Sequence, residues 1–250
     1  MKNGVLSDTQ ISALIDGGAI SASVDFEHGQ VQPASLDLRL GLRAYRVRAS
    51  FLTGHGQSVA DRLAQFTMHE IDLTDGALLE KNCVYVVPLM ESLSLPHGMT
   101  AAASAKSSTG RLDLLTRIIT NNGVEFDRVP EGYAGPLFVE ICPRSFSVLV
   151  RPGLMLNQII FRNGKTFITD SDLAALHAKT PIVDGDAVIS DGLGFSVDLK
   201  PQSGDLVGYR AKPHTGVIDL AQVSHYEPSD FWEEVRTTDG HIILDPGAFY

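Results

Sequence analysis

The 250-residue sequence has only two cysteines, Cys83 and Cys142, and they lie far apart in apolar, strand-like segments. Two isolated thiols exclude a scaffold held together by disulfides, and buried reduced cysteines are typical of such positions. The eight histidines are scattered, and no Cys-x-x-Cys pattern occurs. We therefore expect no zinc site and no other protein-bound catalytic metal.

Long apolar runs are also missing. No stretch approaches the ~18 residues that a transmembrane helix requires, and the first ten residues contain no apolar signal-peptide core. We expect a soluble protein that acts in the cytoplasm and does not bind membranes.

Basic residues are outnumbered, with 20 Lys and Arg against 30 Asp and Glu and a net charge of −10. This balance argues against a nucleic-acid-coating protein, because no basic excess is available to neutralise a phosphate backbone. Residues 101–120 are a local exception, since they carry Lys106, Arg111 and Arg117 against Asp113. A positive patch in an acidic protein suits a small polyanion better than a polymer.

What the sequence does have is 44% hydrophobic residues, 23 Gly and 12 Pro, with apolar runs that are mostly short. This composition predicts a sizeable core built from many strands and turns, with a few short helices. We expect helices after the Ser7–Gln10 capping box and around Val59–Phe66. The alternating segment 36–40 predicts a half-buried strand, in which Asp37 and Arg39 share one face and could pair with each other.

The loop Lys106-Ser107-Ser108-Thr109-Gly110-Arg111 combines two cations, three hydroxyls and one glycine. Such a loop can donate charge-assisted and hydroxyl hydrogen bonds to phosphate oxygens, with backbone N–H groups made accessible by the glycine. The alternative is an ordinary solvated turn before a short helix.

A strand is predicted at Leu137–Cys142, directly after the turn signal Pro130–Tyr133. Glu140 lies between Phe138 and Cys142 on one face of that strand. A carboxylate in this place is either paired or takes part in chemistry. The alternative is that this face is simply exposed to solvent.

The second half of the sequence echoes the first. Phe195–Leu199 resembles Ala34–Leu38, and the segment from Thr238 to Tyr250 resembles that from Thr74 to Tyr85. We therefore predict a catalytic unit at residues 1–165, a helical connector at 166–193 and a partial second repeat at 194–250. In that repeat, Phe195–Leu199 and Ile242–Tyr250 should be strands. The repeat contains no counterpart of the 106–140 segment, so we expect no active site there.

Five segments occur in an order that resembles the dCTP deaminases of the dUTPase-like superfamily, in their longer, duplicated bacterial form. They are S-D-x-x-I, P-A-S-L-D-L-R-L-G, K-S-S-T-G-R-L, G-Y-A-G-P-L-F-V-E and L-V-R-P-G. The resemblance implies a distorted antiparallel β-barrel that forms a homotrimer, with active sites at subunit boundaries. It also implies hydrolysis of dCTP to dUTP and ammonia by a glutamate-activated water, with Mg²⁺ arriving on the substrate triphosphate and no zinc.

The same resemblance assigns roles to individual residues. Glu140 would be the general base and proton shuttle, and Ser107 and Arg111 would hold the water and the carboxylate. The expected substrate-binding residues are Lys106 and Ser108 at the phosphates, Asp127 and Tyr133 at the deoxyribose, and Gln158 at the triphosphate.

This chain departs from the family pattern in three places. Lys106 replaces a more usual arginine, Glu131 competes with Asp127 for the acidic position at the sugar, and no lid segment is visible after Gly164. Two other functional readings remain open. One is a dUTP pyrophosphatase or a bifunctional deaminase that releases dUMP, and the other is a non-enzymatic nucleotide-binding trimer.

Overall fold

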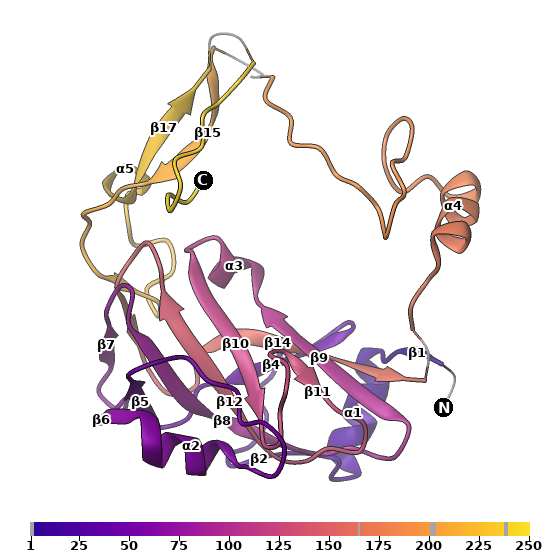
Figure 1. Cartoon of the computed structure of the whole chain (residues 1–250), viewed down its shortest axis with the longest axis vertical. Coiled ribbons are helices and arrows are strands. Elements are labelled where there is room, and N and C mark those ends of the chain that lie inside the picture. Colours follow the sequence, from indigo (N-terminus) through magenta and orange to yellow (C-terminus); the bar gives the residue numbers. More distant parts are fainter. Residues whose placement is uncertain (1–2, 165, 201–203, 238–239) are drawn as a thin grey trace.

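The computed structural model describes residues 3–164, 166–200, 204–237 and 240–250. Most of its regular elements are strands, as Figure 1 shows, which confirms the mainly β prediction. None of the helices in these ranges is long and apolar enough to cross a bilayer. In chain order the elements are β1 (Gly4–Val5), α1 (Asp8–Asp16), β2 (Ile20–Ala22), β3 (Val31–Gln32), β4 (Ser35–Arg39), β5 (Arg43–Val47), α2 (Val59–Phe66), β6 (Thr67–Asp72), β7 (Ala77–Leu79), β8 (Val84–Ser94), β9 (Met99–Ala105), α3 (Ser107–Gly110), β10 (Leu114–Thr120), β11 (Arg128–Val129), β12 (Ala134–Pro143), β13 (Val148–Val150), β14 (Met155–Asn163), α4 (Asp170–Lys179), β15 (Leu206–Ala211), β16 (Ile218–Asp219), α5 (Pro228–Phe231) and β17 (Trp232–Arg236).

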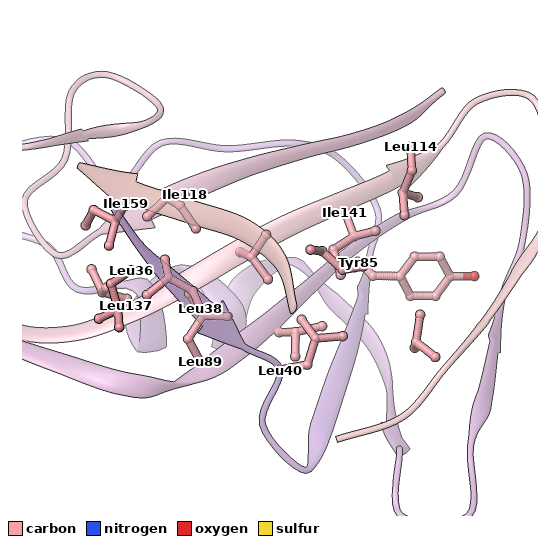
Figure 2. Close-up of a cluster of buried hydrophobic side chains, with 14 of the residues drawn as sticks. Leu36, Leu38, Leu40, Tyr85, Leu89, Leu114, Ile118, Leu137, Ile141 and Ile159 are labelled. Carbon is pink, nitrogen blue, oxygen red and sulfur yellow. The ribbon is translucent and has the colours of Figure 1, made fainter. Parts of the chain in front are cut away.

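Two six-stranded antiparallel sheets form the body of the molecule. The first has the order β11-β9-β14-β4-β3 with β1 beside β14, and the second has the order β10-β12-β8-β5-β6 with β2 beside β8. Their facing sides share one apolar core, to which Leu36 and Ile159 contribute from the first sheet and Ile118 and Ile141 from the second (Figure 2). Over the described residues both sheets are open, so they do not close into the ring of an ideal barrel.

Strand β4 is buried on both faces, which corrects the prediction of a half-buried strand. Asp37 and Arg39 also do not pair with each other. Asp37 forms an ion pair with Lys106, and the Arg39 Nε atom lies 2.8 Å from Glu91 Oε1. The physical reason is that side chains two apart on a strand stand about 7 Å from each other, whereas neighbouring strands bring charged groups into contact.

A second, smaller apolar cluster covers the outer face of β12. Helix α2 contributes Val59 and Leu63, and these pack with Phe51 and Phe138. Both ends of α2 agree with the sequence prediction, and the Ser58 side chain caps its N-terminus by accepting a hydrogen bond from Asp61 N at 3.1 Å. Because this cluster covers the Phe138 face, Glu140 on the same face is enclosed.

The C-terminal part of the chain packs on the body through β16, which pairs in parallel with β13. The ring centroid of Phe146 lies 5.7 Å from that of Phe231 and 5.4 Å from that of Trp232, both in edge-on arrangements. Strands β15 and β17 form a separate two-stranded antiparallel sheet beyond this contact (Figure 1).

The strands predicted at Phe195–Leu199 and Ile242–Tyr250 are wrong, because neither segment has strand structure. The side chains of Phe195 and Val197 are 80% and 84% exposed, so no core or partner strand holds the first segment in a ladder. The second contains a turn, in which Ala248 N donates to Asp245 O at 3.1 Å. Thr238 and Asp239, which belong to the second echo, lie outside the described residues. The repeat at 194–250 stays a prediction.

Candidate active site

Glu140 occupies the middle of the second sheet. It lies on β12, opposite Arg117 of β10 on one side and Val86 of β8 on the other. Its side chain is 1% exposed. The Oε1 atom accepts a hydrogen bond from Arg117 Nε at 3.1 Å and a second, shorter one from Nη2. Within the described part of the chain, Oε2 has no hydrogen-bond partner. One carboxylate oxygen of Glu140 is therefore hydrogen-bonded to Arg117, and the other has no partner among the described residues.

Arg117 is a functional candidate that the sequence alone did not single out, because there it counted only as one cation of a positive patch. Its Nη2 atom also donates to Ser50 Oγ at 3.0 Å, and its guanidinium carbon lies 3.8 Å from the centroid of the Phe126 ring. A signal for it was present, because Arg117 lies between Leu115 and Ile119 on one face of a strand, as Glu140 lies between Phe138 and Cys142. The missing information was the register that places the two opposite each other.

Asp127 lies beside this pair. Its Oδ1 atom accepts a hydrogen bond from Ile118 N at 2.8 Å. Burial raises the pKa of Asp127, while the Ile118 amide and the positive charge of Arg117 oppose that shift. The competing residue Glu131 points elsewhere: it accepts a hydrogen bond from Gly98 N at 2.8 Å and forms an ion pair with His97. The geometry favours Asp127 as the acidic residue near Glu140.

Tyr133 is buried at the base of the β10–β12 hairpin. Its hydroxyl donates to Pro136 O at 2.7 Å and accepts from Asn121 N at 3.2 Å. Burial raises the pKa of this hydroxyl. Gly135 passes so close that a Cβ atom on it would lie 2.9 Å from the Tyr133 hydroxyl oxygen, and its φ of +154° also disfavours a side chain. The tyrosine is therefore fixed in place.

The Lys106–Arg111 loop forms the one-turn helix α3, on the side of the two-sheet body that faces β15 and β17 (Figure 1). The Thr109 hydroxyl and the Lys106 amide both donate to Leu156 O, each at 2.9 Å, and so anchor the loop to β14. Ser107 and Ser108 remain exposed. These contacts leave the two serine hydroxyls directed to solvent and available to a ligand.

Lys106 and Gln158 lie near each other on the face of the first sheet that points away from the core. Gln158 on β14 stands opposite Asp37 of β4 and Ser104 of β9, and its side chain contacts Ser104 Oγ at 3.4 Å. Asp37 in turn forms the ion pair with Lys106. The expected triphosphate-binding residues Lys106, Ser108 and Gln158 are thus brought to one region.

Arg111 is exposed and borders a hollow of about 360 Å³ with aromatic side chains of the C-terminal part. Of the hydrogen bonds and ion pairs that the described residues form, none joins Ser107 or Arg111 to Glu140. The predicted site residues therefore do not converge on one place within one chain. Glu140 lies with Asp127 and the additional residue Arg117, Tyr133 packs in the main core, and the remaining group comprises Lys106, Ser107, Ser108, Arg111 and Gln158.

A hollow of about 750 Å³ lies apart from both groups, beside Arg128 and Arg162. It contains neither the buried carboxylate nor the serine loop, so we place the chemistry by its reactive groups and not by this volume. No three His, Cys, Asp or Glu side chains converge to hold a metal ion in the described ranges.

Comparison with known proteins gives a consistent assignment. Residues 2–165 match the family model of the 2'-deoxycytidine 5'-triphosphate deaminase N-terminal domain, and residues 169–250 match that of its C-terminal domain. The structure is similar to the crystal structure of 2'-deoxycytidine 5'-triphosphate deaminase from Agrobacterium tumefaciens, with a TM-score of 0.94 and 47% identity over 99% of this chain and 75% of that chain.

Two curated relatives are more distant. The dCTP deaminase of Actinobacillus succinogenes is 25% identical over 164 residues, which cover 62% of this chain and 81% of that protein. A "dCTP deaminase, dUMP-forming" from a Nocardioides species is 28% identical over 158 residues, which cover 63% of this chain and 78% of that protein.

Proposed function

Because this chain belongs to the 2'-deoxycytidine 5'-triphosphate deaminase family, we propose that it hydrolyses dCTP to dUTP and ammonia. Membership of this family makes the chain an enzyme, which removes the reading as a non-enzymatic trimer. The observation that carries the proposal is Glu140, a buried carboxylate with one oxygen held by Arg117 and the other free.

In the proposed reaction, Glu140 Oε2 takes a proton from a water molecule as the water oxygen attacks C4 of cytosine. The carboxylic acid then returns that proton to ring N3. The second water proton leaves with the amino group as C4–N4 breaks, giving ammonia and the uracil carbonyl. One carboxylate can serve both as base and as acid, because it ends each cycle in the state in which it began. Ser107 and Arg111 orient the water and the carboxylate.

The second group of residues binds the rest of the substrate. Lys106, Ser108 and Gln158 contact the triphosphate, which carries Mg²⁺ into the site as part of the substrate. Asp127 accepts a hydrogen bond from the deoxyribose, and the Tyr133 ring packs against C2' and excludes a ribonucleotide. Lys106 would exchange its ion pair with Asp37 for a phosphate oxygen when the nucleotide binds.

We further propose that the active site is completed between subunits of a homotrimer. Two observations support this. Within the described part of one chain, no hydrogen bond or ion pair joins the groups around Glu140 and around Ser107. The connector at 166–193 also exposes large apolar side chains such as Phe167, Ile168 and Val188. An exposed apolar segment of this kind is stabilised by burial against another copy of the chain.

Mixing two inactive variants tests the shared site. If each site takes Glu140 from one subunit and Arg111 from the next, random mixing of the two variants restores both residues in roughly a quarter of the sites. Glu140→Gln and Arg111→Ala chains, co-refolded in equal amounts, are therefore expected to regain roughly a quarter of the wild-type rate. Deaminase assays after mixing measure the recovery. Each variant refolded alone is the control, and a mixture no more active than the variants alone would show that each site lies within one subunit.

Product analysis tests the proposed activity itself. Incubation with dCTP and Mg²⁺ is expected to yield dUTP and equimolar ammonia, and dUTP given alone should persist. The name of the Nocardioides relative supports one alternative, a bifunctional enzyme, in which case dUMP and pyrophosphate would appear as well.

Chelation tests the absence of a catalytic zinc ion from the proposed reaction. A zinc-selective chelator should leave the rate of deamination unchanged, and activity restored only by zinc would contradict the proposed chemistry.

We place this activity in the cytoplasm, where the two free thiols remain reduced.

A further inference from the structure

Arg117 and Glu140 form a cross-strand pair in the interior of a sheet. They are directly opposite each other in the β10–β12 ladder, and the register is continuous from Leu114 opposite Pro143 to Thr120 opposite Leu137. Seven consecutive residue pairs therefore fix the relative position of the two side chains. Directly opposite side chains lie within about 5.5 Å at Cβ, which is within reach of an arginine–glutamate pair.

The arginine is held from two further sides. The aromatic ring of Phe126 covers one face of its guanidinium group, with 3.8 Å between the ring centroid and the guanidinium carbon. The Ser50 hydroxyl accepts a hydrogen bond from Nη2 at 3.0 Å. Phe126 belongs to the hairpin loop and Ser50 to the segment before α2, so three separate parts of the chain converge on this one guanidinium.

This arrangement restrains one carboxylate oxygen only. Nε and Nη2 of Arg117 both bind Glu140 Oε1, whereas a bidentate ion pair would engage both oxygens. Oε2 remains the orphaned acceptor among the described residues. A pair that served stability alone would have no reason to leave a buried acceptor unsatisfied, because such an atom is unfavourable.

We propose that Arg117 is a positioning residue for the reaction, which anchors Glu140 by Oε1 and thereby presents Oε2 to the attacking water. The inference rests on the proposed function of Glu140 as the general base. It adds a residue that the sequence resemblance does not assign, and it gives Arg117 a role distinct from that of Arg111, which is exposed and does not contact Glu140 in the described structure. Arg117 acts through Glu140 and does not itself touch the substrate.

The test compares Arg117→Gln and Arg117→Lys with wild type in steady-state dCTP deamination. Arg117→Gln is expected to lower kcat about 100-fold with KM changed less than about threefold, because positioning acts on the chemical step. Arg117→Lys keeps a cation beside Oε1, so its kcat should be about tenfold higher than that of Arg117→Gln. Arg128→Gln, which removes an exposed arginine on the neighbouring strand β11, is the matched control and should behave as wild type.

Several outcomes would overturn the inference. The first is a kcat for Arg117→Gln within threefold of wild type. The second is a loss of kcat/KM that comes from a higher KM, and the third is a kcat for Arg117→Lys no higher than that for Arg117→Gln. Folding is checked by thermal melting, and Arg117→Lys supplies the comparison if the glutamine variant does not fold.

A crystal structure of a folded variant decides the question without any activity measurement. The Glu140 carboxylate is expected to leave its place opposite residue 117, and a carboxylate that stays there would contradict the inference. Failure of the proposed function would appear in the wild-type enzyme itself, as no ammonia released from dCTP.

Discussion

Replacing Glu140 by glutamine is expected to lower kcat for dCTP deamination by about 10²–10⁴-fold, the range that a positioned general base contributes. Glutamine has nearly the same shape as glutamate and fills the same buried space between β10 and β8. Its amide cannot take a proton from water or return one to ring N3. Its carbonyl oxygen can still accept the hydrogen bonds from Arg117, so the local structure should persist.

Binding and chemistry can be separated in this variant. Titration calorimetry with dCTP and Mg²⁺ should show an affinity within a few-fold of wild type, because the triphosphate-binding residues are on other elements. Glu131→Gln is the matched control, since Glu131 lies in the same hairpin but is exposed and paired with His97. That variant should keep nearly full turnover. Turnover by Glu140→Gln within tenfold of wild type would rule out Glu140 as the base.

Replacing Glu91 by alanine is expected to lower the free energy of unfolding by about 3–5 kcal/mol, the usual effect of removing one partner from a buried ion pair. The Glu91 and Arg39 side chains are 0% and 1% exposed. Glu91 Oε1 accepts hydrogen bonds from Arg39 Nε at 2.8 Å and from Gln30 Nε2 at 2.7 Å, and Oε2 accepts one from Arg39 N at 2.8 Å. Without Glu91, the charge of Arg39 would stay buried with the backbone carbonyls of Asp25 and Val24 and, at 3.6 Å, the exposed carboxylate of Glu27 as its remaining partners.

Urea unfolding measures this effect, and Glu70→Ala is the control. Glu70 also pairs with an arginine, Arg43, but both side chains are exposed, so its loss should change stability by no more than about 1 kcal/mol. The double variant Arg39→Met with Glu91→Leu should recover much of the lost stability, because it removes both charges together. A loss for Glu91→Ala no larger than that for Glu70→Ala would show that the buried network contributes little.

Several features of the site follow from local sequence alone. The carboxylate between Phe138 and Cys142 marked Glu140 as paired or reactive, and the structure shows it paired. The bounds of α2 could be read from a capping serine and an apolar periodicity, because both are properties of a few consecutive residues. The hydroxyl-rich loop at 106–111 was recognisable in the same way, and its serines are indeed exposed.

Charge pairing could not be read in this way. From the sequence, Asp37 and Arg39 were each other's nearest opposite charges, yet one pairs with Lys106 and the other with Glu91. The partners lie 69 and 52 residues away along the chain. The echo of earlier segments also suggested strands at Phe195–Leu199 and Ile242–Tyr250, yet neither segment has strand structure.

By itself, the amino-acid sequence determined which residue types are available for chemistry, the mainly β class and the family to which the chain belongs, because these depend on composition, local periodicity and the order of short motifs. Only the tertiary structure decided that Arg117, and not Arg111 of the same chain, contacts Glu140, that Oε2 is the oxygen without a partner among the described residues, and that the serine loop and the glutamate form separate groups in one chain. These facts depend on strand register and on contacts between distant segments. A shift of register by one residue would reverse every side chain of β10 without changing the sequence, so no local pattern can specify them.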